Sequence, residues 1–158
     1  MDRKVKGYNI LELLFIISLV IILGYIGLRE FQIYMARERL KIAAEELLST
    51  VKLARSQSVI GPFHHGIFCR NTTNDWIYFR DLNRNTFYDN GEEILISALT
   101  SKYGYGIRIV NTSTVFLFDR TGQALSTGRF GNCTLENAFG ERIRVTVDSV
   151  GRITIQRE

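Results

Sequence analysis

The sequence predicts an α+β protein in which a long N-terminal α-helix packs on a C-terminal antiparallel β domain. Three observations predict this fold class. An uncharged apolar run extends from Leu13 to Leu28. Apolar residues then recur at helical spacing, without a proline, as far as Ser58. The rest of the 158 residues holds short β-branched or aromatic segments bounded by Gly, Asn, Asp and Ser, a pattern typical of strands and turns.

The N-terminal helix is expected over residues 8–60. Its first part, residues 8–28, has the roughly 20 apolar residues that a helix needs to cross a bilayer. Its second part, residues 29–60, is amphipathic, and Gly61-Pro62 is expected to end it. The positions expected to pack on the following domain are Leu40, Ala43, Ala44, Leu47, Leu48, Val51 and Ala54.

Residues 1–7 form a short basic leader that ends in Gly7, directly before Tyr8. A secretory signal peptide would place its cleavage site after the apolar region, whereas this glycine stands before it. Glu12 is the one carboxylate at the start of the apolar helix, and an ionisable side chain within a membrane segment normally marks function. The alternative interpretation is a plain single-pass anchor that tolerates a glutamate near the headgroups.

The spacing of Gly7, Tyr8 and Glu12 before a long apolar run resembles the type IV prepilin leader. One departure is Asn9-Ile10-Leu11, which stands where the family often has Thr-Leu-Ile. The resemblance implies that a prepilin peptidase cuts after Gly7 on the cytoplasmic face and methylates Tyr8. It also implies a single-pass inner-membrane protein with residues 61–158 in the periplasm. In the family, the glutamate at the place of Glu12 neutralises the N-terminus of a neighbouring subunit during filament assembly.

The end of the helix carries a second resemblance. A Leu-rich turn at Leu47-Leu48 and the segment Ala54-Arg55-Ser56 are similar to those of GspH/FimT-type minor pseudopilins. That family implies a pilin-like fold and a non-enzymatic subunit of a type II secretion pseudopilus, located near the filament tip among other pseudopilins. The alternative is a minor type IV pilin that binds DNA during uptake. An enzyme is not expected, because no nucleophile–base set or cofactor loop is visible.

The β domain, residues 61–158, is expected to hold eight short strands and no further helix. Clear alternation in the last two strands, with Asp148-Ser149-Val150-Gly151 between them, predicts a terminal hairpin. The expected strands are Gly66–Cys69, Trp76–Arg80, Ile94–Leu99, Gly106–Val110, Thr114–Phe118, Asn132–Glu136, Arg142–Val147 and Arg152–Gln156.

A segment between two of these strands has the oxygen side chains of a calcium-binding loop. They fall at positions 1, 3, 5, 9 and 12, as in EF-hand loops, and a backbone carbonyl would serve at position 7. Thr86, however, occupies position 6, where the turn favours glycine, and the flanks are strands. The alternative to calcium is an Asx-rich hairpin whose side chains bond their own backbone. The candidate ligands are Asp81, Asn83, Asn85, Phe87, Asp89 and Glu92.

Two cysteines, Cys69 and Cys133, lie in candidate strands far apart in the sequence. In an oxidising periplasm they would either form a disulfide or remain two buried thiols. Their spacing fits no metal site. The adjacent His64 and His65 are expected in a loop.

Three C-terminal arginines carry the DNA-binding alternative: Arg142, Arg144 and Arg152. FimT-type proteins resemble DNA receptors with a Gly-Arg-x-Arg element, which here reads Gly151-Arg152-Ile153-Thr154 and lacks the second arginine. The formal net charge is +4, and it falls to about +2 when the leader is removed, which is too small to indicate nucleic acid by itself. An ordinary solvated sheet face is the favoured interpretation of these residues.

Overall fold

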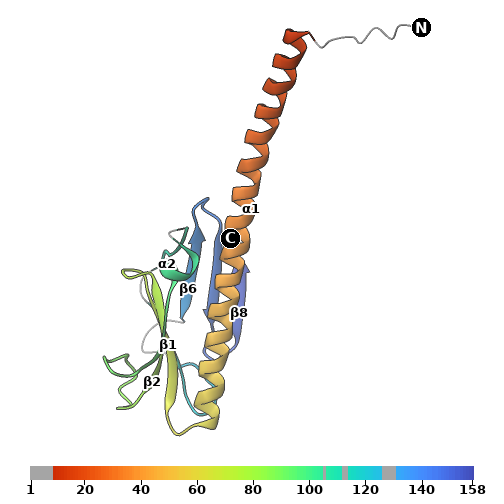
Figure 1. The fold of residues 1–158 in the computed structure, drawn as a ribbon. Helices are drawn as coiled ribbons and strands as arrows, with labels where there is room; N and C mark the ends of the chain where they lie inside the picture. The colour runs from red at the N-terminus through yellow and green to blue at the C-terminus, as the bar shows by residue number, and fades with distance from the viewer. Residues whose placement is uncertain (1–8, 105, 112–113, 126–130) are drawn as a thin grey trace, which may run out of the picture. The chain divides into compact units, whose positions relative to one another are not determined.

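The computed structural model describes residues 9–104, 106–111, 114–125 and 131–158. The chain divides into two compact units, Met1–Met35 and Ala36–Glu158, and the second unit is called the head below. Helix α1 (Ile10–Ile60) supplies the secondary structure of the first unit and continues into the head (Figure 1). It begins after Asn9, whose carbonyl accepts the backbone N–H of Glu12, and it ends directly before Gly61-Pro62, as predicted.

The head contains two four-stranded sheets, in which all neighbouring strands are antiparallel. The first sheet has the order β3-β2-β1-β5 and consists of β1 (His64–Arg70), β2 (Asp75–Asp81), β3 (Glu93–Ala98) and β5 (Thr114–Phe118). The second has the order β4-β6-β7-β8 and consists of β4 (Ile107–Ile109), β6 (Asn132–Asn137), β7 (Arg142–Val147) and β8 (Ile153–Arg157). The α+β class and the terminal hairpin, β7–β8, are therefore confirmed.

One hydrophobic core joins α1 to both sheets. The helix contributes a stripe that includes Leu40, Leu47 and Val51, spaced so that all three point to the same side. Trp76 from the first sheet and Val145 from the second are buried in the same cluster. Burying apolar surface from three layers in one cluster is what holds the helix and the sheets together.

The opposite face of the first sheet is also apolar. Ile77, Phe79 and Leu117 form a second, smaller buried cluster there. Tyr88, from the loop between β2 and β3, packs against Phe79 with ring centroids 5.5 Å apart. That loop is therefore attached to the outer face of the sheet by an aromatic contact.

The expectation of no further helix was wrong. A short helix, α2 (Leu99–Tyr103), follows β3 directly, so Leu99 lies in a helix where a strand end was expected. A single turn of five residues is too short to show a helical period in the sequence. The two histidines were also placed wrongly, because β1 begins at His64 and pairs His65 with Arg80 of β2.

Candidate functional site

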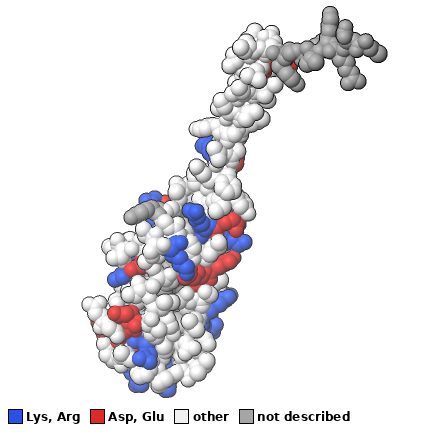
Figure 2. Space-filling model, in the orientation of Figure 1, with Lys and Arg blue, Asp and Glu red and all other residues white. Residues whose placement is uncertain are grey.

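The part of α1 from Ile10 to Leu28, called the anchor below, is exposed along its whole length. It belongs to the one helix in the described chain that is long and apolar enough to cross a membrane. Figure 2 shows the anchor as an almost uncharged surface. An apolar helix with no protein packed on it requires lipid or other apolar helices around it.

Glu12 lies in the first turn of α1 and its side chain is exposed. A carboxylate near a helix N-terminus is favoured by the helix dipole, and this also makes the position compatible with helix initiation. No ion pair involves Glu12 within the described chain. Gly7 and Tyr8, the predicted processing residues, lie outside the described residues.

The predicted calcium-ligand residues lie at the end of β2 and in the hairpin loop between β2 and β3, where hydrogen bonds link several of them. The carboxylate of Asp81 accepts the backbone N–H of Thr86 at 3.1 Å. At the other end, Glu92 accepts the backbone N–H of Leu82 at 2.9 Å and that of Asp89 at 3.1 Å. The carboxylates of Asp81 and Glu92 therefore both accept hydrogen bonds from the backbone of the loop between them.

The middle of the loop is held by side-chain amides. Asn83 and Asn85 each donate to Oδ2 of Asp89 at 2.7 Å. Their carbonyl oxygens accept the backbone N–H groups of Asn85 and Phe87, respectively, which forms two consecutive Asx turns. In the described chain, no three His, Cys, Asp or Glu side chains converge as a metal cluster, so carboxylates alone do not form a site.

Thr86, at the position where glycine was favoured, has a φ of 69°. A β-branched residue in this left-handed region is strained, whereas glycine adopts it freely. We expect Thr86→Gly to stabilise the head by about 1 kcal/mol, measured by urea unfolding. Thr72→Gly is the matched control, because Thr72 is an exposed turn residue without a positive φ. The account is contradicted if both changes destabilise the head equally.

The two cysteines meet inside the core, although they lie on different sheets. Cys69 of β1 and Cys133 of β6 are both fully buried, and both are free thiols in the structure. Burial and the neighbouring Cys133 raise the pKa of the Cys69 thiol. A thiol held in its protonated form reacts slowly in disulfide exchange. The predicted bridge between them stays a prediction.

Each of the three candidate DNA-binding arginines lies beside a carboxylate. Arg142 pairs with Glu136 at 2.6 Å, and Arg144 pairs with Glu158 at 2.5 Å. Arg152, which directly precedes β8, pairs with Asp148 at 2.9 Å. Figure 2 shows that acidic and basic residues are also mixed on the face of the head that it displays. These side chains do not form a purely basic surface.

Glu136 is the centre of the strongest of these contacts, because it is buried and binds two arginines. Hydrogen bonds from Arg108 and then from Arg142 hold the pKa of Glu136 below its ordinary value of 4.5. The side chains of Arg108 and Arg142 are more than half exposed, so the charge of the buried carboxylate is neutralised by two arginines at the surface of the head. The contact of Arg108 with Glu136 was not predictable from a local pattern, because the two residues are 28 positions apart and lie on different strands.

The depressed pKa of Glu136 makes part of the stability of the head dependent on pH. Its contribution is fully present above pH 4.5 and is lost as the pH falls through the lower folded-state pKa. We expect Glu136→Gln to reduce the free energy of unfolding by about 1–2 kcal/mol at pH 7, and by less in acid. Urea unfolding at several pH values measures the difference. Glu158→Gln, at a partly exposed pair, is the control and should change little; an equal loss in both variants would contradict the assignment.

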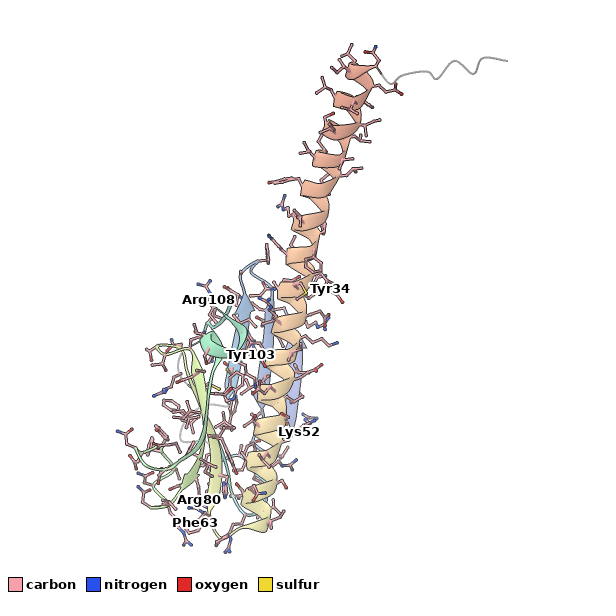
Figure 3. All side chains as sticks on the ribbon, in the orientation of Figure 1. Tyr34, Lys52, Phe63, Arg80, Tyr103 and Arg108 are labelled. Carbon is pink, nitrogen blue, oxygen red and sulfur yellow. The ribbon has the colours of Figure 1, made fainter. Side chains whose placement is uncertain are left out.

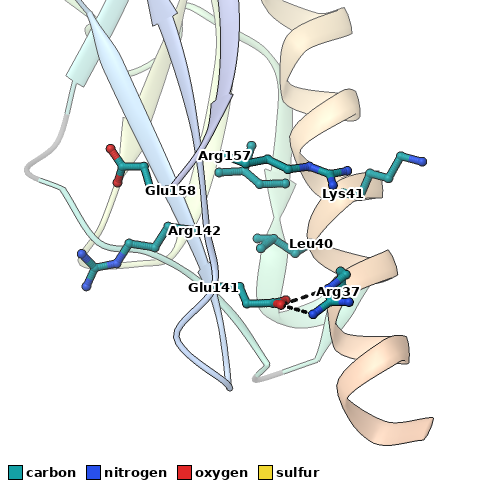
Figure 4. Close-up of a pocket in the computed structure, with 8 residues that line it drawn as sticks. Arg37, Leu40, Lys41, Glu141, Arg142, Arg157 and Glu158 are labelled. Atoms are coloured by element: carbon teal, nitrogen blue, oxygen red, sulfur yellow. Dashed lines mark hydrogen bonds and ion pairs between the residues drawn. The ribbon is translucent and has the colours of Figure 1, made fainter. Parts of the chain in front are cut away.

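Further charged residues, which no motif in the sequence indicated, fix α1 to the rest of the head. Glu46 of α1 accepts hydrogen bonds from Lys102 and Tyr103 of α2, and Tyr103 is labelled in Figure 3. Arg37 donates to Glu141, in the turn before β7, at 2.9 Å. This pair borders a pocket of about 160 Å³ between α1 and the ends of β7 and β8 (Figure 4). These contacts position the helix; they form no reactive set.

Comparison with known proteins gives one family and one similar fold. The family model described as Type II transport protein GspH matches residues 43–151, more than half of the chain. A solved structure, the minor pseudopilin EpsH from the type 2 secretion system of Vibrio cholerae, has 12% sequence identity and a TM-score of 0.55. The match covers 75% of this chain and 97% of that one, and at this identity it shows the fold alone. The sequence matches no curated protein.

Proposed function

This chain belongs to the GspH family of type II transport proteins, and we propose that it is a minor pseudopilin of a type II secretion system. It joins the pseudopilus through its N-terminal helix, near the filament tip, with other pseudopilins as neighbours. The observation that carries the proposal is the exposed apolar anchor with Glu12 in its first turn. A helix of this kind serves both as a membrane anchor before assembly and as a packing element within a filament.

Processing of the leader precedes assembly in this proposal. A prepilin peptidase cuts after Gly7 and methylates the new N-terminal residue, Tyr8. Because the family leader is cut on the cytoplasmic face, the chain crosses the inner membrane once and places the head in the periplasm. The resemblance of the leader and the family match support this orientation.

Glu12 supplies the specific contact for assembly. After cleavage the N-terminal amine of Tyr8 is a cation in or near the apolar phase, and Glu12 lies four residues further along the chain, in the first turn of α1. Unpaired charges in a low dielectric are costly, and pairing recovers much of that cost. When the carboxylate of one subunit meets the amine of its neighbour, the pair fixes how far the two helices are displaced along the filament axis.

The contacts of the head favour this assembly role over DNA binding. Arg142, Arg144 and Arg152 are each engaged by a carboxylate, so a phosphate would have to displace an existing partner. We therefore propose a structural subunit and neither a DNA receptor nor an enzyme.

A deletion strain tests the proposal when secretion and DNA uptake are measured side by side. We expect loss of the chain to block release of type II secreted proteins into the medium, to leave natural transformation unchanged, and to be reversed by the wild-type gene. Normal secretion together with a loss of transformation would overturn the proposal in favour of the DNA-binding pilin.

A further inference from the structure

The β2–β3 loop contains a buried carboxylate oxygen that the protein does not satisfy. The side chain of Asp81 is fully buried, and its Oδ1 has no hydrogen-bond partner among the described residues. Its other oxygen, Oδ2, accepts the N–H of Thr86 from within the loop. A buried carboxylate oxygen without a partner is costly, so Oδ1 of Asp81 calls for a cation or a hydrogen-bond donor.

His64 is the nearest alternative partner for this carboxylate. Its Nδ1 lies 3.9 Å from Oδ2 of Asp81, which is too long for a hydrogen bond, and this nitrogen is itself without a partner. The histidine therefore leaves Oδ1 unsatisfied.

We propose that the β2–β3 loop is a calcium site. The fully buried Asp81 and the buried Glu92 provide a carboxylate at each end, and exposed Asp89 provides a third between them. The oxygens of Asn83 and Asn85 and the backbone carbonyl of Phe87 complete a set of six donors. Calcium takes six to eight oxygen ligands from carboxylates, amides and backbone carbonyls in this order along a loop.

The chemistry of the loop selects calcium over other common ions. The donor set contains only oxygen, and no histidine or cysteine lies between Asp81 and Glu92, which argues against zinc and copper. Magnesium demands a smaller octahedral shell and keeps several waters, so it suits a six-donor protein loop poorly. Binding requires the amides of Asn83 and Asn85 to release Asp89 and to present their oxygens to the ion.

Calorimetry on the full-length chain in detergent micelles tests the site. After removal of divalent ions with EGTA, we expect CaCl₂ to bind at one site with a Kd of about 10⁻⁴–10⁻³ M, the range of extracellular calcium modules, and MgCl₂ to give no comparable heat. Absence of binding at millimolar CaCl₂ would overturn the proposal.

Two variants and one control assign the site to the loop. Glu92→Gln keeps an oxygen that can accept the N–H of Leu82 but loses the carboxylate, and with it the acceptor for the N–H of Asp89, so we expect at least about tenfold weaker binding. Asn83→Ala, at an exposed position, removes one donor without disturbing a buried residue and should also weaken binding. Glu45→Gln, the same chemical change on the exposed surface of α1, should bind as the wild type does.

Thermal unfolding gives a second measurement that does not depend on heats of binding. Saturating CaCl₂ should raise the Tm of the wild type and of Glu45→Gln, because a ligand that binds only the folded state stabilises it. It should leave the Tm of Glu92→Gln nearly unchanged. If Glu92→Gln gained the same Tm shift, or bound calcium as tightly as the wild type, the ion would not be in this loop.

Discussion

Gly151→Ala is expected to destabilise the head by about 4 kcal/mol, enough to leave a large fraction unfolded. A Cβ at this position would lie 2.0 Å from the carbonyl oxygen of Gly122. The same carbonyl accepts the Nε–H of Arg55 from α1 at 3.0 Å. The β7–β8 turn, the turn after β5 and the helix thus meet at one glycine, and a methyl group there forces backbone apart. Its φ of 76° adds strain.

Gly140→Ala separates the effect of the steric clash from the effect of a positive φ. Gly140 lies in the β6–β7 turn with a φ of 82°, but a Cβ there would contact nothing within 4 Å. We expect this control to lower the free energy of unfolding by only about 1 kcal/mol, because alanine is strained at a positive φ but meets no other atom there. Urea unfolding followed by the fluorescence of Trp76, the single and buried tryptophan, measures both variants. Equal losses would contradict the close approach of Gly151 to Gly122.

Glu12→Ala is expected to leave the chain inserted and processed but to reduce its incorporation into filaments at least about tenfold. A tenfold loss requires only about 1.4 kcal/mol, less than the cost of leaving an amine unpaired in the apolar phase. Copurification of the variant with sheared filaments, relative to its level in the membrane, measures the effect.

Glu30→Ala is the matched control for this experiment. Glu30 is an exposed glutamate on the same helix, beyond the apolar run, and its removal should not affect incorporation. If Glu12→Ala entered filaments as well as Glu30→Ala does, the pairing of Glu12 with a neighbouring N-terminus would be contradicted.

The helix and the strands were predictable because their signals are local. The apolar stripe around Leu47 and the stop at Gly61-Pro62 depend only on nearby residues, and both were confirmed. Strand positions followed from alternation and from turn residues, with errors of one or two positions at most ends. Helix α2 was not predicted, because its five residues are too few to show the repeat of apolar residues that indicates a helix.

The division into two sheets was not predictable, because it depends on long-range pairing. β5 pairs with β1, across about fifty residues of chain, and no local pattern in either strand specifies its partner. The candidate sites also differ in whether their residues are close in the sequence or are brought together only by the fold. The spacing from Asp81 to Glu92 predicts a calcium-binding loop from the sequence, because the six candidate ligands lie close together along the chain, and the bound ion stays a prediction. The contact between Arg108 and Glu136 could be found only from the structure, because the two residues lie on different strands. This contact indicates that arginines of this sheet neutralise a buried carboxylate.

Gly151, in the turn between β7 and β8, belongs to a sequence motif and also lies where backbone from another turn approaches closely. Gly151-Arg152 matches part of the Gly-Arg-x-Arg element that the DNA-binding alternative depends on. In the structure the glycine is required by its contact with Gly122, and Arg152 pairs with Asp148 in the same turn. The close approach of backbone at Gly151 and the ion pair of Arg152 therefore give both residues a structural role.

Mass spectrometry of the native protein, purified from its membrane, tests most directly whether the chain is a processed pseudopilin. The account predicts an N-terminus at Tyr8 that carries one methyl group, with the apolar helix intact behind it. A chain that retains Met1, or one cut beyond Leu28 so that the head is released from its anchor, would contradict it.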